Sequence, residues 1–300
     1  MRILFILALA LVCGLVRGQD INCAGCEKSG KLPHNGKDVN AIDGPLEFAI
    51  VTDLTGIGEG ENGLPRRERI FKRAIDQINV ANPEFTVSVG DLVQGPSDKD
   101  PRPMPEQWAE FNGWVKEFNA RFYYVVGNHD IGTLGEQAEW CRQHGARYYH
   151  FVYKNVLFLF LDSEDPPPTR ISAAQAEFVE QALAENTKVD WTLVFFHKPF
   201  WSYMAPATPD PGWERVKAAL QKDGRKHTVF AGHVHRYMHY TIDGTEYYTL
   251  ATTGGNHDFT KGPKDGQFDH FTWVTMTKDG PKLLNVLLDD LPEYAGATTE

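Results

Sequence analysis

The chain has 300 residues and a formal net charge of -10, with 42% hydrophobic and 23% charged residues. This length allows one large domain or two small ones, and the composition is that of an ordinary globular protein. An excess of acidic residues argues against non-specific binding to nucleic acid or to an anionic membrane surface. Phosphate could still bind in a local pocket, especially one that holds cations.

The N-terminus has the pattern of a cleavable signal peptide over residues 1–18. Arg2 precedes an apolar run from Ile3 to Val16, and Gly18 ends a segment typical of a cleavage site. The run is shorter than the ~20 residues that span a bilayer, although an uncleaved anchor is the alternative. We therefore expect a secreted or periplasmic protein with no transmembrane segment after cleavage.

The three cysteines beyond the signal peptide predict little metal or redox chemistry. Cys23 and Cys26 lie in a polar tail over residues 19–44, and in an oxidising compartment they most simply form a small disulfide. A redox motif would need a strand and a helix around the pair, and a zinc site would need a second pair. We expect Cys141 to be a buried thiol on a helix.

Strand and helix patterns alternate from Leu46 onward. The pattern predicts strands over 46–53, 84–91, 122–130, 190–200 and 227–235, and helices over 66–81, 105–119, 135–145, 172–186 and 212–224. Residues 148–163 indicate two strands around a turn at Lys154–Asn155, and 238–255 and 271–288 indicate hairpins with Asp-Gly turns. This order indicates one α/β domain over 45–291, with a mixed sheet or two packed sheets and a short tail over 292–300.

Polar side chains follow five of the predicted strands. They are Asp53, Asp91, Asn128, His129, His197, His233 and His235. Any one of them alone would more often be a turn or core residue, but the carboxyl ends of parallel strands meet at one edge, where ligands bind. Asp, Asn and His without Cys suit Mn, Fe, Zn or Mg. Seven groups exceed one tetrahedral site and favour two metal ions.

The order D…GD…GNHD…H…GHVH, between Leu46 and Leu288, resembles the calcineurin-like metallophosphoesterase superfamily. The resemblance implies an α/β fold, a four-layer α/β/β/α sandwich with two mixed β-sheets. It also implies hydrolysis of phosphomonoesters or phosphodiesters by a hydroxide that two divalent metal ions activate. It assigns Asp53 and His235 to the first metal, Asn128, His197 and His233 to the second, and Asp91 to both. It implies that His129 acts on the leaving oxygen and that Asp130 orients it.

Thr55 departs from the pattern of that superfamily, in which a histidine ligand of the first metal usually stands two places after the first aspartate. Thr55 could bind a metal weakly or hold a water, Gln94, Glu59 or Glu61 could replace the histidine, or the site could hold one metal or none. We expect a filled but weaker first site that favours Mn or Mg. The alternatives are a single-metal enzyme and a phosphate- or nucleotide-binding module with little turnover.

Three long loops, 95–106, 164–171 and 202–212, are expected to form the rim of the site. Trp201 and Tyr203 could stack on a base or sugar, or simply pack the loop. Arg170 could contact a phosphate and His257 could reach the site, whereas His270 is expected to be structural. The expected partner is a small phosphorylated substrate, and a peptidase is disfavoured because the chain has no HExxH motif.

Overall fold

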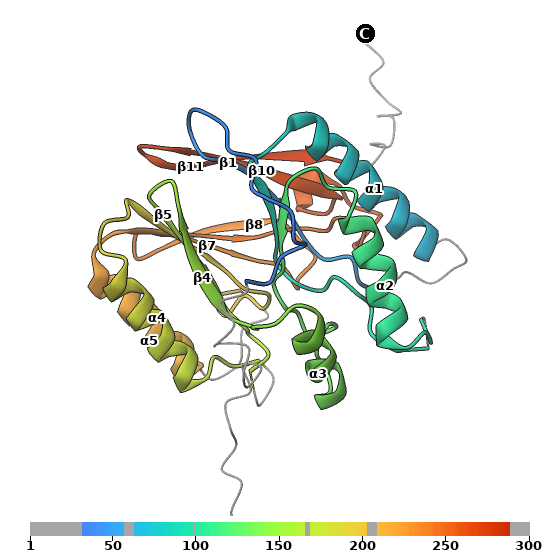
Figure 1. The fold of residues 1–300 in the computed structure, drawn as a ribbon, viewed down its shortest axis with the longest axis horizontal. Helices are drawn as coiled ribbons and strands as arrows, with labels where there is room; N and C mark the ends of the chain where they lie inside the picture. The colour runs from blue at the N-terminus through green and yellow to red at the C-terminus, as the bar shows by residue number, and fades with distance from the viewer. Residues whose placement is uncertain (1–31, 57–62, 99, 166–168, 203–208, 289–300) are drawn as a thin grey trace, which may run out of the picture.

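The computed structural model describes residues 32–56, 63–98, 100–165, 169–202 and 209–288 (Figure 1). Two mixed β-sheets form its centre. The first has the strand order β11-β10-β1-β2-β3 and the second the order β4-β5-β6-β7-β9-β8. The first sheet comprises β1 (Glu47–Val51), β2 (Phe85–Ser88), β3 (Arg121–Tyr123), β10 (His270–Thr277) and β11 (Gly280–Leu287). The second comprises β4 (Tyr149–Tyr153), β5 (Val156–Phe160), β6 (Trp191–Phe195), β7 (Lys226–Ala231), β8 (Met238–Ile242) and β9 (Thr245–Thr249).

Helices cover the outer face of each sheet (Figure 1). The first sheet is covered by α1 (Gly63–Ala81), α2 (Met104–Val115) and α3 (Leu134–Gln143). The second sheet is covered by α4 (Ala173–Glu185) and α5 (Pro211–Asp223). A short 3₁₀ helix, η1 (Pro263–Asp265), precedes β10. The side chains of each central strand alternate between two hydrophobic clusters. In β5, Phe158 and Phe160 pack between the sheets, whereas Leu157 and Leu159 pack under α4 and α5. The predicted four-layer α/β/β/α sandwich is therefore confirmed.

The central strands run parallel, which brings their carboxyl ends to a common edge. β1, β2 and β3 are parallel in the first sheet, and β5, β6, β7 and β9 are parallel in the second. The two sheets meet at this edge, because the backbone N–H of His233, after β7, donates to the carboxylate of Asp53, after β1, at 2.8 Å. The fold therefore places residues from both sheets around one site.

Several local predictions are confirmed by the structure. Ser172 caps α4, where its hydroxyl accepts from the backbone N–H of Gln175. The turns at Lys154–Asn155 and Asp243–Gly244 both have positive φ at each central residue, as type I′ hairpin turns require. The last hairpin differs slightly, because its turn residues are Lys278 and Asp279 and Gly280 already begins β11.

The predicted strand over 122–130 is wrong beyond Tyr123. After that residue the chain leaves the ladder, since Tyr124 donates its N–H to the carbonyl of Pro33 and Val125 donates to the hydroxyl of Ser88. The described part of the expected tail, residues 32–44, lies along this edge of the first sheet, where His34 forms an antiparallel bridge with Tyr123.

Cys141 is not the free thiol that the sequence suggested. It lies on α3 and is disulfide-bonded. The expected bridge between Cys23 and Cys26, like the signal peptide over 1–18 and the tail over 292–300, lies outside the described residues. Among the described residues, no helix combines the length and the apolar character that crossing a membrane requires.

Candidate metal centre

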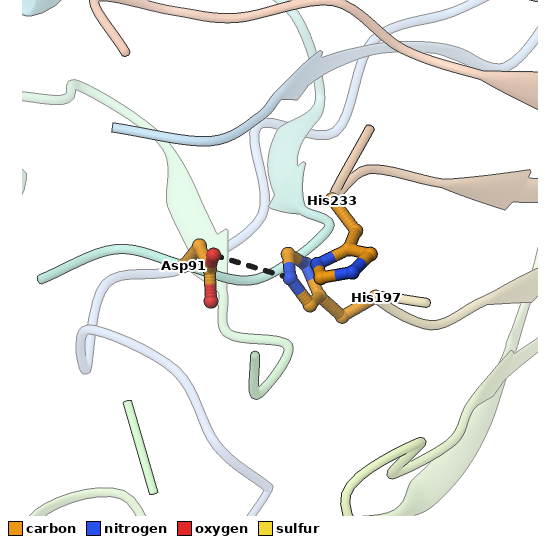
Figure 2. A group of neighbouring side chains, drawn as sticks. All are labelled: Asp91, His197 and His233. Carbon is orange, nitrogen blue, oxygen red and sulfur yellow. Dashed lines mark ion pairs between the residues drawn. The ribbon is translucent and has the colours of Figure 1, made fainter. Parts of the chain in front are cut away.

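The predicted ligands converge at the shared edge of the sheets. Their nitrogen and oxygen atoms form two groups, in each of which the atoms lie within 4.8 Å of one another. One group comprises Asp53, Asp91 and His235, and the other comprises Asp91, His197 and His233 (Figure 2). Asp91 belongs to both. This arrangement fits two cations that share one bridging carboxylate.

Asn128 adds an oxygen to the second group. Its Oδ1 lies 3.1 Å from Nε2 of His197, and that same nitrogen lies 3.2 Å from the Asp91 carboxylate. The second group therefore offers four potential ligands from two sheets. The first group offers three, with Nε2 of His235 at 3.4 Å from the Asp53 carboxylate.

Backbone carbonyls orient two of the histidines for metal binding. Nδ1 of His197 lies 2.9 Å from the carbonyl of Val89, and Nδ1 of His235 contacts the carbonyl of Asn256. In each ring Nδ1–H then donates to the carbonyl, and Nε2 keeps its lone pair for a cation. Contacts of this kind fix the ring and raise its basicity as a ligand.

Burial and neighbouring charges shift the pKa values of the candidate ligands. Burial alone would lower the pKa of His197, but the Asp91 carboxylate beside it raises that pKa to about 10. Burial and the charge of His197 lower the pKa of His233 to about 3. Burial would raise the pKa of Asp53, yet the contacts with His235 and His197 leave it lowered overall. A bound cation competes with the protons on these groups, because each ligand binds metal in its deprotonated form.

Close backbone approach and left-handed residues shape the loops that carry the ligands. Asp91, His233 and His235 have φ of 56°, 69° and 50°. Such values are uncommon for residues with a side chain and cluster at functional sites. A Cβ at Gly127 would lie 2.3 Å from atoms of Asp91, and one at Gly232 would lie 2.2 Å from the Asp53 carboxylate. Only glycine lets these loops approach the ligands so closely.

Asp130 does not orient His129, and this predicted role is corrected. Its carboxylate accepts four backbone N–H groups, at 2.8 to 3.1 Å, from Asp91, Leu92, Val93 and Gly127. Burial and the negative charge of Asp91 raise the pKa of Asp130. The backbone N–H donors oppose that rise, because hydrogen bonds to the carboxylate favour its ionised form. Asp130 therefore ties together the loops that follow β2 and β3.

The ring of His129 is held by a different group. Its Nδ1 lies 2.6 Å from the carbonyl of Gln94, and its backbone N–H donates to Asp91 at 2.9 Å. With Nδ1–H donating to this carbonyl, Nε2 is the nitrogen left for a substrate. Sequence reasoning missed this contact because a backbone carbonyl carries no residue signature.

Comparison with known proteins agrees with this geometry. Residues 46–237, more than half of the chain, match the model of the family described as calcineurin-like phosphoesterase. The chain belongs to the calcineurin-like phosphoesterase family. The members are hydrolases, and curated relatives are named as a phosphatase and a phosphodiesterase.

Two curated relatives illustrate the range of the family. The chain is 29% identical to serine/threonine-protein phosphatase CPPED1 of Homo sapiens over 222 residues, which is 64% of this chain and 70% of the relative. It is 29% identical to 3',5'-cyclic adenosine monophosphate phosphodiesterase CpdA of Haemophilus influenzae over 133 residues, 42% of this chain and 45% of the relative.

Solved structures share the fold of this calcineurin-like phosphoesterase. A dimetal phosphatase from Danio rerio aligns with TM-score 0.57 and 14% identity, over 82% of this chain and 100% of that one. The purple acid phosphatase PPD1 of yellow lupin aligns with TM-score 0.58 and 17% identity, over 78% and 50%. At these identities the likeness concerns the fold alone.

Thr55 faces the shared carboxylate of the phosphoesterase site. It is fully buried, and its hydroxyl donates to Asp91 at 3.2 Å. Gln94, which is also buried, contacts the same turn, since its side-chain oxygen accepts from the N–H of Gly56 at 2.9 Å. Its Nε2 lies 3.4 Å from Nδ1 of His129. Gln94 thus bridges the Thr55 turn and the His129 loop. Glu59 and Glu61 lie outside the described residues.

The expected rim residues differ in where they lie. Trp201 packs into the cluster under the second sheet, against Phe196, Trp213 and Tyr247. Of the two roles considered for Trp201, the structure therefore supports packing of the loop. Arg170 is exposed, and Tyr203 lies outside the described residues. His257 is nearly buried beside Asp269, in the loop whose Asn256 contacts His235.

A charged residue that sequence reasoning did not single out lies next to the ligand His197. Lys198 donates from Nζ to Glu164 at 2.8 Å and to Thr169 at 2.9 Å, which anchors the 164–171 loop beside the site. Its positive charge also contributes to the lowered pKa of His233. His270 is fully buried, and its Nε2 accepts the N–H of Ala251 at 3.1 Å.

Proposed function

We propose that this calcineurin-like phosphoesterase is a secreted, metal-dependent hydrolase that cleaves phosphomonoesters or phosphodiesters with two divalent cations. The observation that carries the proposal is the pair of ligand groups that share Asp91. Mn, Fe, Zn and Mg all suit such oxygen and imidazole donors. The disulfide at Cys141 supports an oxidising compartment, where such bonds persist.

The residues present fit two cations. Asp53, Asp91 and His235 would hold the first, and Asp91, Asn128, His197 and His233 would hold the second. The first group has one ligand fewer, because Thr55 stands where an imidazole is usual in the family. Its oxygen-rich donors favour a harder ion such as Mn or Mg. We therefore infer that the first cation binds more weakly than the second.

The cations would supply Lewis acidity toward the phosphate oxygens and lower the pKa of water to near neutrality. The chain's own residues perform the remaining tasks. The imidazoles of His197 and His235 keep Nε2 toward the ligand groups through their carbonyl partners. His129, held at Nδ1 by Gln94, can donate a proton from Nε2 to the departing alkoxide.

Metal content per chain and turnover together test this proposal. The mature protein would be purified without chelator, supplied with Mn, Fe and Zn, and analysed for metals while phosphomonoester and phosphodiester hydrolysis is measured. We expect about two metals per chain and turnover that a chelator abolishes. One metal per chain with turnover would instead favour a single-metal enzyme.

The second candidate function is a phosphate- or nucleotide-binding module with little turnover, and Thr55 is the observation that favours it. Binding of phosphate to a metal-loaded chain that hydrolyses neither class of ester would establish this alternative. The contact between His129 and the carbonyl of Gln94 favours the enzyme, because a module that only binds phosphate has no use for an oriented acid.

A further inference from the structure

The loop between β9 and β10 carries an exposed aromatic ring and contacts the first ligand group through another of its residues. The loop begins at the edge where the ligands lie, because β9 is parallel to β7. Asn256 in this loop contacts His235 through its carbonyl and donates its N–H to the carbonyl of Thr55 at 2.9 Å. Phe259 follows three residues later. Arg66, which donates to the carbonyl of Gly255 at 3.1 Å, also lies against the ring of Phe259, so the ring is tied to the loop that contacts the first ligand group.

Two charged groups fix the position of this loop. The buried carboxylate of Asp269 accepts from the hydroxyl of Thr252 at 2.6 Å and from the N–H of Gly254 at 2.7 Å, and it pairs with Arg66 in α1. Arg66 also donates to the carbonyls of Gly254 and Gly255, at 3.3 and 3.1 Å. Arg66 thus joins the start of α1 to the loop.

Arg66 and His257 support the ring of Phe259. The guanidinium carbon of Arg66 lies 4.6 Å from the ring centroid, and the imidazole of His257 lies at 4.3 Å with an interplanar angle of 51°. A cation over the ring face is attractive and restrains the ring. Phe259 still leaves 55% of its surface exposed.

Phe259 differs from the other exposed apolar residues of the described chain. Those are aliphatic: Val80, Leu134, Val152, Ile242 and Leu284. A single exposed apolar side chain is normal and needs no explanation. A restrained aromatic ring in the loop that contacts the first ligand group is a different case, because a flat ring of low entropy is what stacking recognition requires.

We propose that Phe259 is the platform on which an aromatic ring of the substrate stacks. The preferred substrates are then phosphoesters whose alcohol part carries a planar aromatic ring, either a nucleoside or an aryl group such as that of phosphotyrosine. This inference rests on the proposed phosphoesterase function and adds a substrate class to it. It gives Phe259 the stacking role that Trp201, packed under the second sheet, does not fill.

The test compares two esters, one with a planar aromatic ring and one with a saturated ring on the same linker. 2-Phenylethyl phosphate and 2-cyclohexylethyl phosphate have the same number of carbon atoms and alkoxide leaving groups of similar pKa. Each is offered to the metal-loaded enzyme as the monoester and as the methyl diester. We expect kcat/KM to favour the aromatic ester by about 2- to 10-fold, the range that aromatic pairs give in double-mutant cycles.

Variants of Phe259 connect that preference to the ring. Phe259→Leu should bring the ratio of the two kcat/KM values to within about 2-fold of unity, and Phe259→Trp should keep it. The matched control is Leu284→Ala on β11, an exposed apolar residue of another element, which should leave the ratio unchanged. Adenosine monophosphate and phosphotyrosine, assayed side by side, then identify which aromatic source is preferred.

Binding of the corresponding phosphonates, measured by calorimetry, separates this inference from the proposed function. A preference for 2-phenylethylphosphonate that Phe259→Leu removes supports the stacking platform even if no ester is hydrolysed. Hydrolysis of both esters with no preference in hydrolysis or binding overturns it and leaves the phosphoesterase intact. An equal loss on both esters in Phe259→Leu also overturns it, since that result indicates a structural role in the loop.

Discussion

Asp130→Asn should destabilise the protein strongly, because the structure makes this residue a tie between two loops. One carboxylate oxygen accepts from Leu92 and Val93, and the other accepts from Asp91 and Gly127. Asparagine keeps the shape but has one oxygen, so two of the four buried N–H groups would face an amide NH₂. Each unsatisfied buried donor costs about 1–3 kcal/mol, which gives about 2–6 kcal/mol in total.

Urea unfolding of the chelator-treated protein at neutral pH measures this change. A loss of about 2–6 kcal/mol is a large part of the 5–15 kcal/mol that holds a typical domain folded. Asp76→Asn, an exposed residue of α1, is the matched control and should change the free energy of unfolding by less than about 0.5 kcal/mol. A variant of Asp130 that unfolds like this control would refute the reasoning.

Three further predictions concern the metals, the acid and the pH dependence of stability. Asp91→Asn should lower the occupancy of both cations and His235→Ala that of one, as elemental analysis would show, because only Asp91 belongs to both ligand groups. His129→Asn should lower kcat/KM on an alkyl phosphoester by about 10²- to 10⁴-fold, and much less on a 4-nitrophenyl ester whose leaving group needs no proton. Burial lowers the pKa of His270 to about 3, below its unfolded value near 6.5, so its contribution to stability is complete above pH 6.5 and declines as the pH falls. Between pH 7 and pH 5 the decline is about 2 kcal/mol, and His270→Gln should remove that part of the slope in urea unfolding.

Each of these three has a contrary outcome. Equal metal loss in Asp91→Asn and His235→Ala would argue against a shared ligand. An effect of His129→Asn that is the same for good and poor leaving groups would argue against proton donation. An unchanged slope in His270→Gln would mean that other groups carry the acid sensitivity.

Much of the fold follows from local signals in the sequence. The continuous apolar run of β5 and the helical spacing in α1 identify their elements, and the Ser172 cap and the Asp243–Gly244 turn identify boundaries. The order of strands does not follow, because β10 pairs with β1 across more than two hundred residues and no local pattern specifies that pairing. The end of β3 was missed for the same reason, since it depends on contacts with Pro33 and Ser88.

The candidate site was also predictable only in part. Residue types at strand ends were enough to predict which side chains come together, because parallel strands must share an edge. The partners of these ligands were not predictable where they are backbone groups, such as the carbonyls of Val89, Gln94 and Asn256. Asp130 was misassigned because its position next to His129 in sequence suggested a contact that the turn between them prevents.

The left-handed conformations of Asp91, His233 and His235 have a practical consequence for work with this protein. These ligand loops are held by contacts within the chain, among them the four N–H bonds of Asp130 and the carbonyl bonds to His197 and His235. We therefore expect these loops to keep their conformation without a cation, unlike those of small domains that fold only around their metal. A chelator should yield a folded apoprotein, into which different metals can be loaded one after another and compared in a single preparation.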